Sequence, residues 1–394
     1  MNDTKALTAD NGRFLAIAKK YWYLLTLVPP ILGVFVASYL LQTGEGLILS
    51  LPLIVFYILI PAADHLFGKD HFNPSKEQEE EYLEDSYYVN LLCLSAALYW
   101  AAIGMVTYAV CTISLPWYHL LAAMLSIGVM HAGTFTLSHE LGHKMSDKKQ
   151  SFFAKLAIAC MGYAHFNIEH NKGHHKDVAT PEDPASSRMG ESLYKFARRE
   201  LPGAAVRGWE LEADRLKRIK KSVWSRDNEI LQCLSITVIG FTTLILISGI
   251  AALPFLLITS AFGWFQLTQA NYIEHYGLLR QKLESGRYER CQPKHSWNSN
   301  YRFSNLITLH LQRHSDHHAH PTRAYQVLRD YDDAPALPSG YPLCMAMSMI
   351  PPLWFAVMDQ KVVRWAEGDM TLVNMDTEKR NELFQRYHDQ AVTA

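Results

Sequence analysis

The sequence predicts an all-α membrane protein, built as a bundle of six transmembrane helices with a cytoplasmic helical cap. Charge segregation is the first observation behind this: long stretches of the 394-residue chain hold no Asp, Glu, Lys or Arg, and strongly polar segments separate them. The second observation is that clustered histidines follow the ends of these stretches. A helix needs roughly 20 residues to cross about 30 Å of hydrocarbon, so the stretch lengths set the number of crossings.

The uncharged stretches predict the spans in order. Residues 21–44 and 46–63 are each close to one crossing in length. Residues 87–139 and 230–273 are each about twice as long and predict two hairpins. Proline and glycine at 114–117 and at 249–254 mark the turn of each hairpin. The total is six spans.

The remaining segments are polar or too short to cross again. Residues 151–170 predict a shallow or re-entrant helix, and residues 188–228 have the pattern of a charged helix. Residues 342–358 are apolar but are interrupted at Pro351 and Pro352. This interruption fits an interfacial helix under the bundle or a core helix of the cap equally well.

Lysine and arginine orient the bundle. Residues 41–46, 112–117 and 249–254 contain neither, whereas both flank the opposite ends of the spans, so both termini and both large polar segments are expected in the cytoplasm. With a formal net charge of −1, nucleic-acid binding has little support. The predicted organisation is a tail with four helices (1–143), a cytoplasmic segment (144–229), two helices (230–273) and a cytoplasmic C-terminal segment (274–394).

Nine histidines form three boxes and one outlier, and each box follows an uncharged or apolar stretch. Histidines three or four residues apart share one face of a helix, and this spacing lets two of them bind one metal ion. The spacing relates His139 to His143, His170 to His174, and His314 to both His317 and His318. Neighbouring histidines point in different directions and can serve two metals. Nine ligands exceed the four to six of one ion, so a dimetal site is expected. The candidate ligands are His139, His143, His170, His174, His175, His275, His314, His317 and His318.

Imidazole suits iron, zinc, copper and nickel alike, so the ligands do not name the metal. The setting favours iron, because a nitrogen-rich site beside an apolar bundle suits oxygen activation next to an apolar substrate. Neutral histidines leave the metal charge to be balanced by nearby carboxylates. The candidates for this role are Glu140, Glu169, Glu274, Asp177, Asp183 and Asp316.

Two other classes of protein share part of this histidine pattern. His139-Glu140-x-x-His143 matches the helix of zinc proteases, but a protease with one zinc would leave six of the nine histidines unexplained. A metal transporter would place its polar ligands near mid-membrane, whereas these boxes lie at the cytoplasmic ends of the spans. Both classes are therefore less favoured than an oxygen-activating enzyme.

Four strings carry a family resemblance: HELGHK at 139–144, EHNKGHHKDVATPEDPASS at 169–187, NYIEHYGL at 271–278 and LQRHSDHHAHP at 311–321. They resemble the signature of the membrane-bound non-haem di-iron alkane 1-monooxygenases, within the wider fatty-acid desaturase and hydroxylase superfamily. The likeness extends to WSxDNEILQ at 224–232 and HSWNSN at 295–300.

The resemblance implies two iron ions held by the nine histidines in a multi-pass protein of the cell inner membrane. It also implies hydroxylation of the terminal methyl of medium-chain n-alkanes to 1-alkanols, with O2 and two electrons. Rubredoxin would supply the electrons and a rubredoxin reductase would act upstream. A fatty-acyl lipid desaturase, or a hydroxylase of another apolar substrate, is the alternative.

A terminal methyl offers no polar group to hold, so an apolar intramembrane channel must place it at the metals. Phe56 and Tyr57 are bulky and lie mid-span, which makes them candidates for the channel gate. By resemblance, this region limits the length of the substrate.

Overall fold

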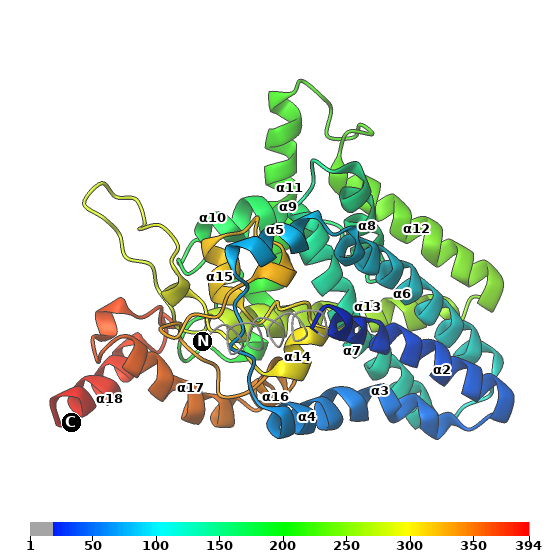
Figure 1. Cartoon of the computed structure of the whole chain (residues 1–394), viewed down its shortest axis with the longest axis horizontal. Coiled ribbons are helices and arrows are strands. Elements are labelled where there is room, and N and C mark those ends of the chain that lie inside the picture. Colours follow the sequence, from blue (N-terminus) through cyan, green and yellow to red (C-terminus); the bar gives the residue numbers. More distant parts are fainter. Residues whose placement is uncertain (1–18, 394) are drawn as a thin grey trace, which may run out of the picture.

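The computed structural model describes residues 19–393, and for residues 388–393 it describes the backbone alone. Within this range all regular secondary structure is helical, apart from isolated β-bridges. Figure 1 shows the apolar helices α2 (Val28–Thr43), α6 (Ser86–Thr112) and α12 (Glu229–Ser248) extending to one side. The C-terminal helices α17 (Pro351–Trp365) and α18 (Arg380–Thr393) lie on the other side. The predicted all-α membrane fold is confirmed.

Five helical segments of the described chain are long and apolar enough to cross a membrane. These are Lys19–Thr43, Gly46–Phe67, Ser86–Thr112, Trp117–Gly142 and Glu229–Ser248. Both hairpins turn where proline and glycine predicted it. α6 ends at Thr112 and α7 begins at Trp117 and ends at Gly142, while α12 ends at Ser248 and is followed by Gly249 with a positive φ of 84°.

The sixth expected span is α13 (Ala252–His275), a 24-residue helix that does not reach the same apolarity. Gln266, Gln269 and Asn271 lower the hydropathy of its second half. These polar residues are tolerated because α13 packs along α7 in the interior. The two helices approach closely at Gly263, where a β-carbon would come 2.8 Å from the Cβ of His131.

The second span is interrupted by a π-helical turn, η3 (Val55–Leu59), between α3 (Leu51–Ile54) and α4 (Ile60–Phe67). A π turn holds one more residue than an α turn and commonly marks a functional position. Phe56 and Tyr57 lie within it.

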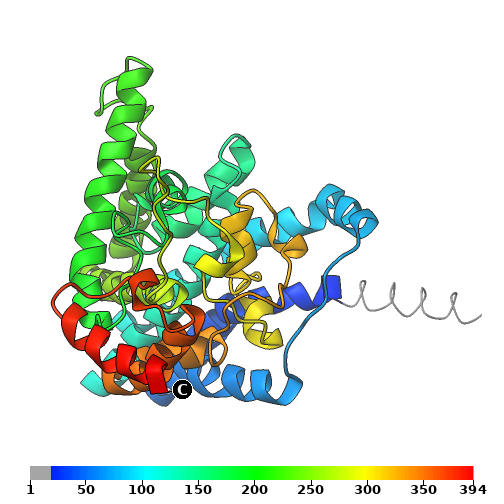
Figure 2. The ribbon, with the colours of Figure 1, turned by 90° about the vertical axis from the view of Figure 1, so that its left-hand side faces the viewer.

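Short helices form the polar middle segment. α8 (Lys148–Ala159) is followed by a turn that contains Met161. The indole N–H of Trp264 on α13 donates to the Met161 carbonyl at 2.7 Å and so ties this turn to α13. The chain then runs through α9 (Phe166–Glu169), the π turn η4 (His170–His174) and α10 (His175–Asp177). The charged helix α11 (Leu193–Arg218) packs on α9 and α13, and its far end rises above the rest of the molecule in Figure 2.

The C-terminal segment closes the cap. α16 (Tyr341–Ser348) and α17 are bent by 120° at the predicted Pro351–Pro352 interruption. The bend follows from proline, which lacks the N–H that would continue the helix. The remaining α-helices of the described chain are α5 (Lys76–Glu84), α14 (Arg302–Ile307) and α15 (His314–Ala319), and short 3-10 helices join the other segments.

Candidate metal centre

The nine candidate histidines come together in one buried region, where they form two groups. The first group is His139, His143, His170, His175 and His317, and the second is His174, His275, His314 and His318. Within each group, the potential ligand atoms lie within 4.8 Å of one another. The two groups adjoin, because the rings of His175 and His318 have centroids 4.5 Å apart.

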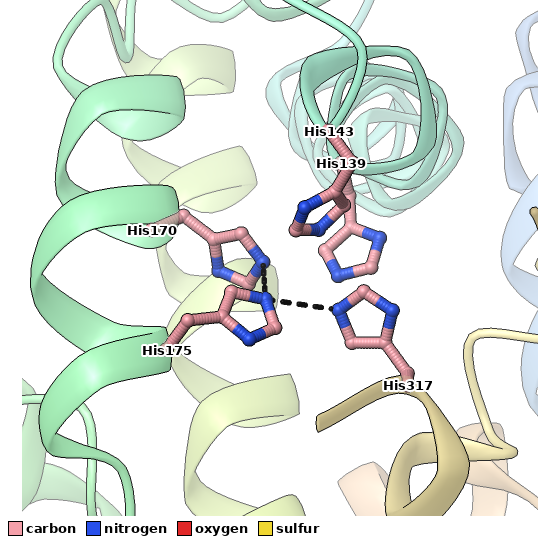
Figure 3. Close-up of side chains that lie close together, drawn as sticks. All are labelled: His139, His143, His170, His175 and His317. Atoms are coloured by element: carbon pink, nitrogen blue, oxygen red, sulfur yellow. Dashed lines mark hydrogen bonds between the residues drawn. The ribbon is translucent and has the colours of Figure 1, made fainter. Parts of the chain in front are cut away.

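Each group draws its histidines from several elements. Figure 3 shows His139 and His143 at the end of α7 facing His170, His175 and His317, with their rings turned toward a common centre. The second group combines His174 with His275 at the end of α13 and with His314 and His318 of α15. No single box therefore forms a site by itself.

The pairing inside the boxes differs from simple helical spacing. His170 pairs with His175, five residues away, at an Nε2–Nε2 distance of 3.0 Å, and His174 joins the other group. The π turn η4 causes this, because its wider turn brings residues five apart together. In the third box His314 pairs with His318 at 2.9 Å, while His317 turns to His175 at 3.0 Å. The expected pairings of His170 with His174 and of His314 with His317 are therefore wrong, whereas neighbouring histidines do serve different groups.

Three contacts bring the first two boxes together. A β-carbon at Gly142 would overlap Oδ1 of Asn167, so only glycine lets the end of α7 approach α9. The Ser138 hydroxyl donates to the same Oδ1 at 3.1 Å, and Asn171 donates to the carbonyl of Gly142 at 2.8 Å.

The third box is held by the HSWNSN stretch and by a buried arginine. The backbone N–H of Trp297 donates to the Glu274 carbonyl at 2.8 Å, and its indole donates to the Tyr276 carbonyl at 2.9 Å. The Ser315 hydroxyl donates to the Ser296 carbonyl at 2.7 Å. Arg313 is 1% exposed and donates to the carbonyl of Leu328 at 2.7 Å. These bonds fix α15 beside the end of α13.

The donor set fits metal ions. The Nε2 atoms of His139, His143 and His174 are buried without a hydrogen-bond partner, and such atoms are rare unless they bind an ion or water. Two imidazole nitrogens bound at right angles to one ion at about 2.1 Å are about 3 Å apart. The Nε2–Nε2 distances of 2.9–3.2 Å in the two groups match this spacing.

Comparison with known proteins agrees with this geometry. The family model described as fatty acid desaturase matches residues 115–347. The chain is 47% identical to an alkane 1-monooxygenase of Pseudomonas putida over 98% of this chain and 96% of the relative. It is 50% identical to the alkane 1-monooxygenase of Ectopseudomonas oleovorans over 94% and 92% of the two chains. It is 47% identical to alkane 1-monooxygenase 1 of Alcanivorax borkumensis over 96% and 93%.

This chain belongs to the alkane 1-monooxygenase family. The resemblance of its motifs is thereby confirmed, and the chain is an enzyme of the membrane. As in the sequence prediction, His139 and His143 lie at the end of the apolar helix α7, whereas the second and third boxes lie on the short elements η4, α10 and α15.

Two of the six candidate carboxylates contact the histidine groups directly. Asp183 accepts a hydrogen bond from Nδ1 of His174 at 2.9 Å, and Oε2 of Glu274 lies 3.2 Å from Nε2 of His314. Both carboxylates are buried. Both can offset part of the charge of a metal in the second group, and Asp183, which contacts the other ring nitrogen of His174, can fix the orientation of that ligand.

Asp183 and Glu169 are joined by Arg207, a residue that no sequence motif singled out. Its guanidinium donates to Oδ1 of Asp183 at 2.6 Å and to Oε1 of Glu169 at 2.9 Å through Nε. Burial acts to raise the pKa of Asp183, but His174 and Arg207 outweigh it and hold that pKa below its usual value. Asp183 is therefore an anion at neutral pH, which favours the tautomer in which Nδ1 of His174 carries the proton.

The other three carboxylates contact residues outside the two histidine groups. Asp177 lies 3.6 Å from Arg207, and Glu140 accepts from the backbone N–H of Tyr325 at 3.1 Å. Asp316 accepts from His320 and Tyr331, each at 2.9 Å. It shares a helix with three candidate ligands, but its side chain faces the opposite side.

Two cavities border one face of α7. Ala132 lines an outer cavity, whereas Phe135 and His139 line an inner cavity, and these positions follow one another at helical spacing. The outer cavity lies between α2, η3 and α7 and includes Phe56. The inner cavity is lined by Phe135, His139, Phe166, His170, Leu267, Ala270, Asn271, Glu274, Leu311 and His314.

Of the two candidates for the channel gate, Phe56 borders a cavity and Tyr57 packs behind it. Phe56 lines the outer cavity. The ring of Tyr57 packs edge-on against Phe56, with centroids 4.9 Å apart, and its hydroxyl accepts from Gln266 at 3.2 Å. Tyr57 therefore braces the second span against α13.

Proposed function

We propose that this protein hydroxylates the terminal methyl of medium-chain n-alkanes at a di-iron centre held by the nine histidines. The alkane, O2, two electrons and two protons give a 1-alkanol and water. The observation that carries the proposal is the convergence of the histidines into two groups beside an inner cavity that is lined in half by apolar side chains. Membership of the alkane 1-monooxygenase family supports the substrate and the reaction.

The first group would hold one iron and the second group the other, and the bound pair would supply the activation of O2. The protein provides orientation and shielding. Asp183 holds the Nδ1 proton of His174, and Glu274 places a carboxylate beside His314. Phe135, Phe166 and Leu311 keep bulk water from the reacting carbon.

We propose that the outer and inner cavities form the substrate channel. An alkane would enter from the bilayer with its methyl toward His139 and its tail beside Phe56. Binding rests on apolar contact along the whole chain, since an alkane offers no polar group. Phe56 and Tyr57 would then form the gate that sets substrate length, with Phe56 in contact with the tail and Tyr57 supporting it.

We propose that electrons arrive from a rubredoxin that lies outside these 394 residues and is reduced by a rubredoxin reductase. The six cysteines of this chain stand apart in sequence, without the paired CxxC motifs of a rubredoxin. The segregation of lysine and arginine supports placement in the cell inner membrane with both termini and the helical cap in the cytoplasm, where such a carrier can reach the centre.

Activity on other apolar substrates is the second candidate, since the matched family model is that of fatty acid desaturases. The deciding experiment supplies purified protein with rubredoxin, its reductase and NADH, and offers octane or an acyl lipid. Formation of 1-octanol supports the proposal, and formation of a desaturated or hydroxylated lipid alone contradicts it.

Metal analysis tests the centre itself. We expect close to two irons per chain, with loss of metal in His175→Ala from the first group and in His318→Ala from the second. His320→Ala is the matched control, because His320 is near these ligands in sequence but belongs to neither group. One zinc per chain would instead point to an intramembrane protease.

A further inference from the structure

A buried glutamate on α11 reaches the inner cavity through an amide. Glu200 is 1% exposed. Its Oε1 accepts a hydrogen bond from Nδ2 of Asn271 at 3.1 Å, and its Oε2 accepts one from the Thr268 hydroxyl at 2.8 Å. The ionisable groups that face it are Tyr163, Glu169 and Asp183, none of which is a cation. Glu200 is thus held by two neutral donors of α13.

The chemistry of the carboxylate decides which end of the Asn271 amide faces it. An ionised carboxylate only accepts hydrogen bonds, whereas a carboxamide has a donating NH2 end and an accepting oxygen. Only the NH2 end can therefore face Glu200. Asn271 lines the inner cavity, so its Oδ1 is the polar atom left for the cavity.

One protonated form of Glu200 is compatible with this arrangement. Burial raises the pKa of Glu200 to about 7, so both forms occur near neutral pH. A hydroxyl can accept as well as donate, whereas an amide NH2 cannot accept. A proton on Oε2 that points to Thr268 leaves Oε1 to accept from Asn271, so the amide orientation of the ionised form is retained in this protonated form.

We propose that Glu200 is a positioning residue that holds the carbonyl oxygen of Asn271 toward the inner cavity. Asn271 precedes His275 by one helical turn, on the same face of α13. The carbonyl oxygen is a neutral acceptor for a water or hydroxyl group beside the second group of histidines. The inference rests on the proposed function, which makes the inner cavity the place of reaction.

The test compares Glu200→Gln, Asn271→Leu and the double variant. Glutamine has nearly the shape of glutamate but can present either end of its amide to Asn271. The Asn271 amide is then no longer held in one orientation. The readout is the visible absorption of the Co(II)-loaded proteins, which responds to the atoms around the metal. We expect each single variant to shift the absorption and the double variant to match Asn271→Leu. Effects of Glu200→Gln that persist unchanged in the Asn271→Leu background would overturn the proposal.

Two further variants separate positioning from folding. Thr268→Val removes the second donor but keeps the Asn271 bond, and we expect its Co(II) absorption to match that of the wild type. Glu200→Asp keeps a group that only accepts, and we expect a smaller shift than in Glu200→Gln; the reverse order contradicts the proposal. Failure of the proposed function shows itself separately, as a wild-type protein that binds no Co(II) and forms no 1-octanol.

Discussion

Gly173 lies directly against Arg207, since a β-carbon at position 173 would come 2.6 Å from the Arg207 Nε atom. The missing side chain lets the guanidinium lie across the π turn η4 and reach both Glu169 and Asp183. A glycine and an arginine that are far apart in sequence thereby set the orientation of His174.

Gly173→Ala is expected to weaken metal binding. The added methyl group pushes the guanidinium away from Asp183, and loss of such a supporting contact typically costs about 10–100-fold in metal affinity. Competition with a chelator measures the effect. Gly104→Ala is the control, because its new methyl group would meet only the flexible tip of Leu244 at 3.1 Å. Equal metal affinities in the two variants would disprove this role of Gly173.

Arg207→Ala is expected to destabilise the fold. It leaves the buried carboxylates of Glu169 and Asp183 without their cation, and breaking a buried ion pair costs about 3–5 kcal/mol. Arg207→Lys keeps the charge but cannot hold two carboxylates in the same geometry, so an intermediate loss is expected. Unfolding in detergent solution measures both, and wild-type stability of the alanine variant would refute the prediction.

Phe56→Ala is expected to lengthen the accepted alkane. Removing the ring enlarges the outer cavity at the place proposed for the substrate tail. The measurement is the yield of 1-alkanol across a series of chain lengths. Phe35→Ala serves as the control, since Phe35 is 50% exposed on α2 and lies outside the outer cavity. The same product profile in wild type and Phe56→Ala would contradict a gate at this position.

The stability of the wild type relative to Glu200→Gln is expected to fall as pH rises. The pKa of Glu200 is about 7 in the folded protein, against about 4.3 in an unfolded chain. Between these values the folded state binds more protons than the unfolded state, so the free energy of unfolding decreases with rising pH and levels off above about pH 7. Between pH 5 and pH 8, the free energy of unfolding of Glu200→Gln should rise by up to about 3 kcal/mol relative to that of the wild type.

Thermal unfolding of both proteins at each pH provides the measurement. Thr268→Val is the companion variant, because it removes a donor to Glu200 but retains the ionisable group. A constant difference between wild type and Glu200→Gln across this pH range would show that Glu200 does not titrate as expected.

The sequence predicted those features that depend on local composition. Charge-free stretches located the spans, and proline and glycine located the breaks after Thr112, after Ser248 and before Pro351. The nine histidines were recognised because their spacing is unusual in itself. The sixth expected span was inferred from the hairpin length, and its polar second half leaves α13 less apolar than the five helical segments that can cross a membrane.

Features that depend on contacts between distant segments were not predictable in this way. Arg207 looks like any cation of a charged helix until α11 packs on α9. Asp316 stands inside a histidine box, yet its side chain turns toward His320 and Tyr331. The division of the histidines between two groups depends on the π turn at His170, which an even α-helical spacing does not foresee.

The π turn η4 also suggests how a site of this kind can change during evolution. A π turn differs from an α turn by one residue, so a single inserted codon can create one within an existing helix. In this chain such a turn pairs His170 with His175 and leaves His174 to the other group. One small insertion can therefore redistribute existing histidines between two metals without the gain of any new ligand.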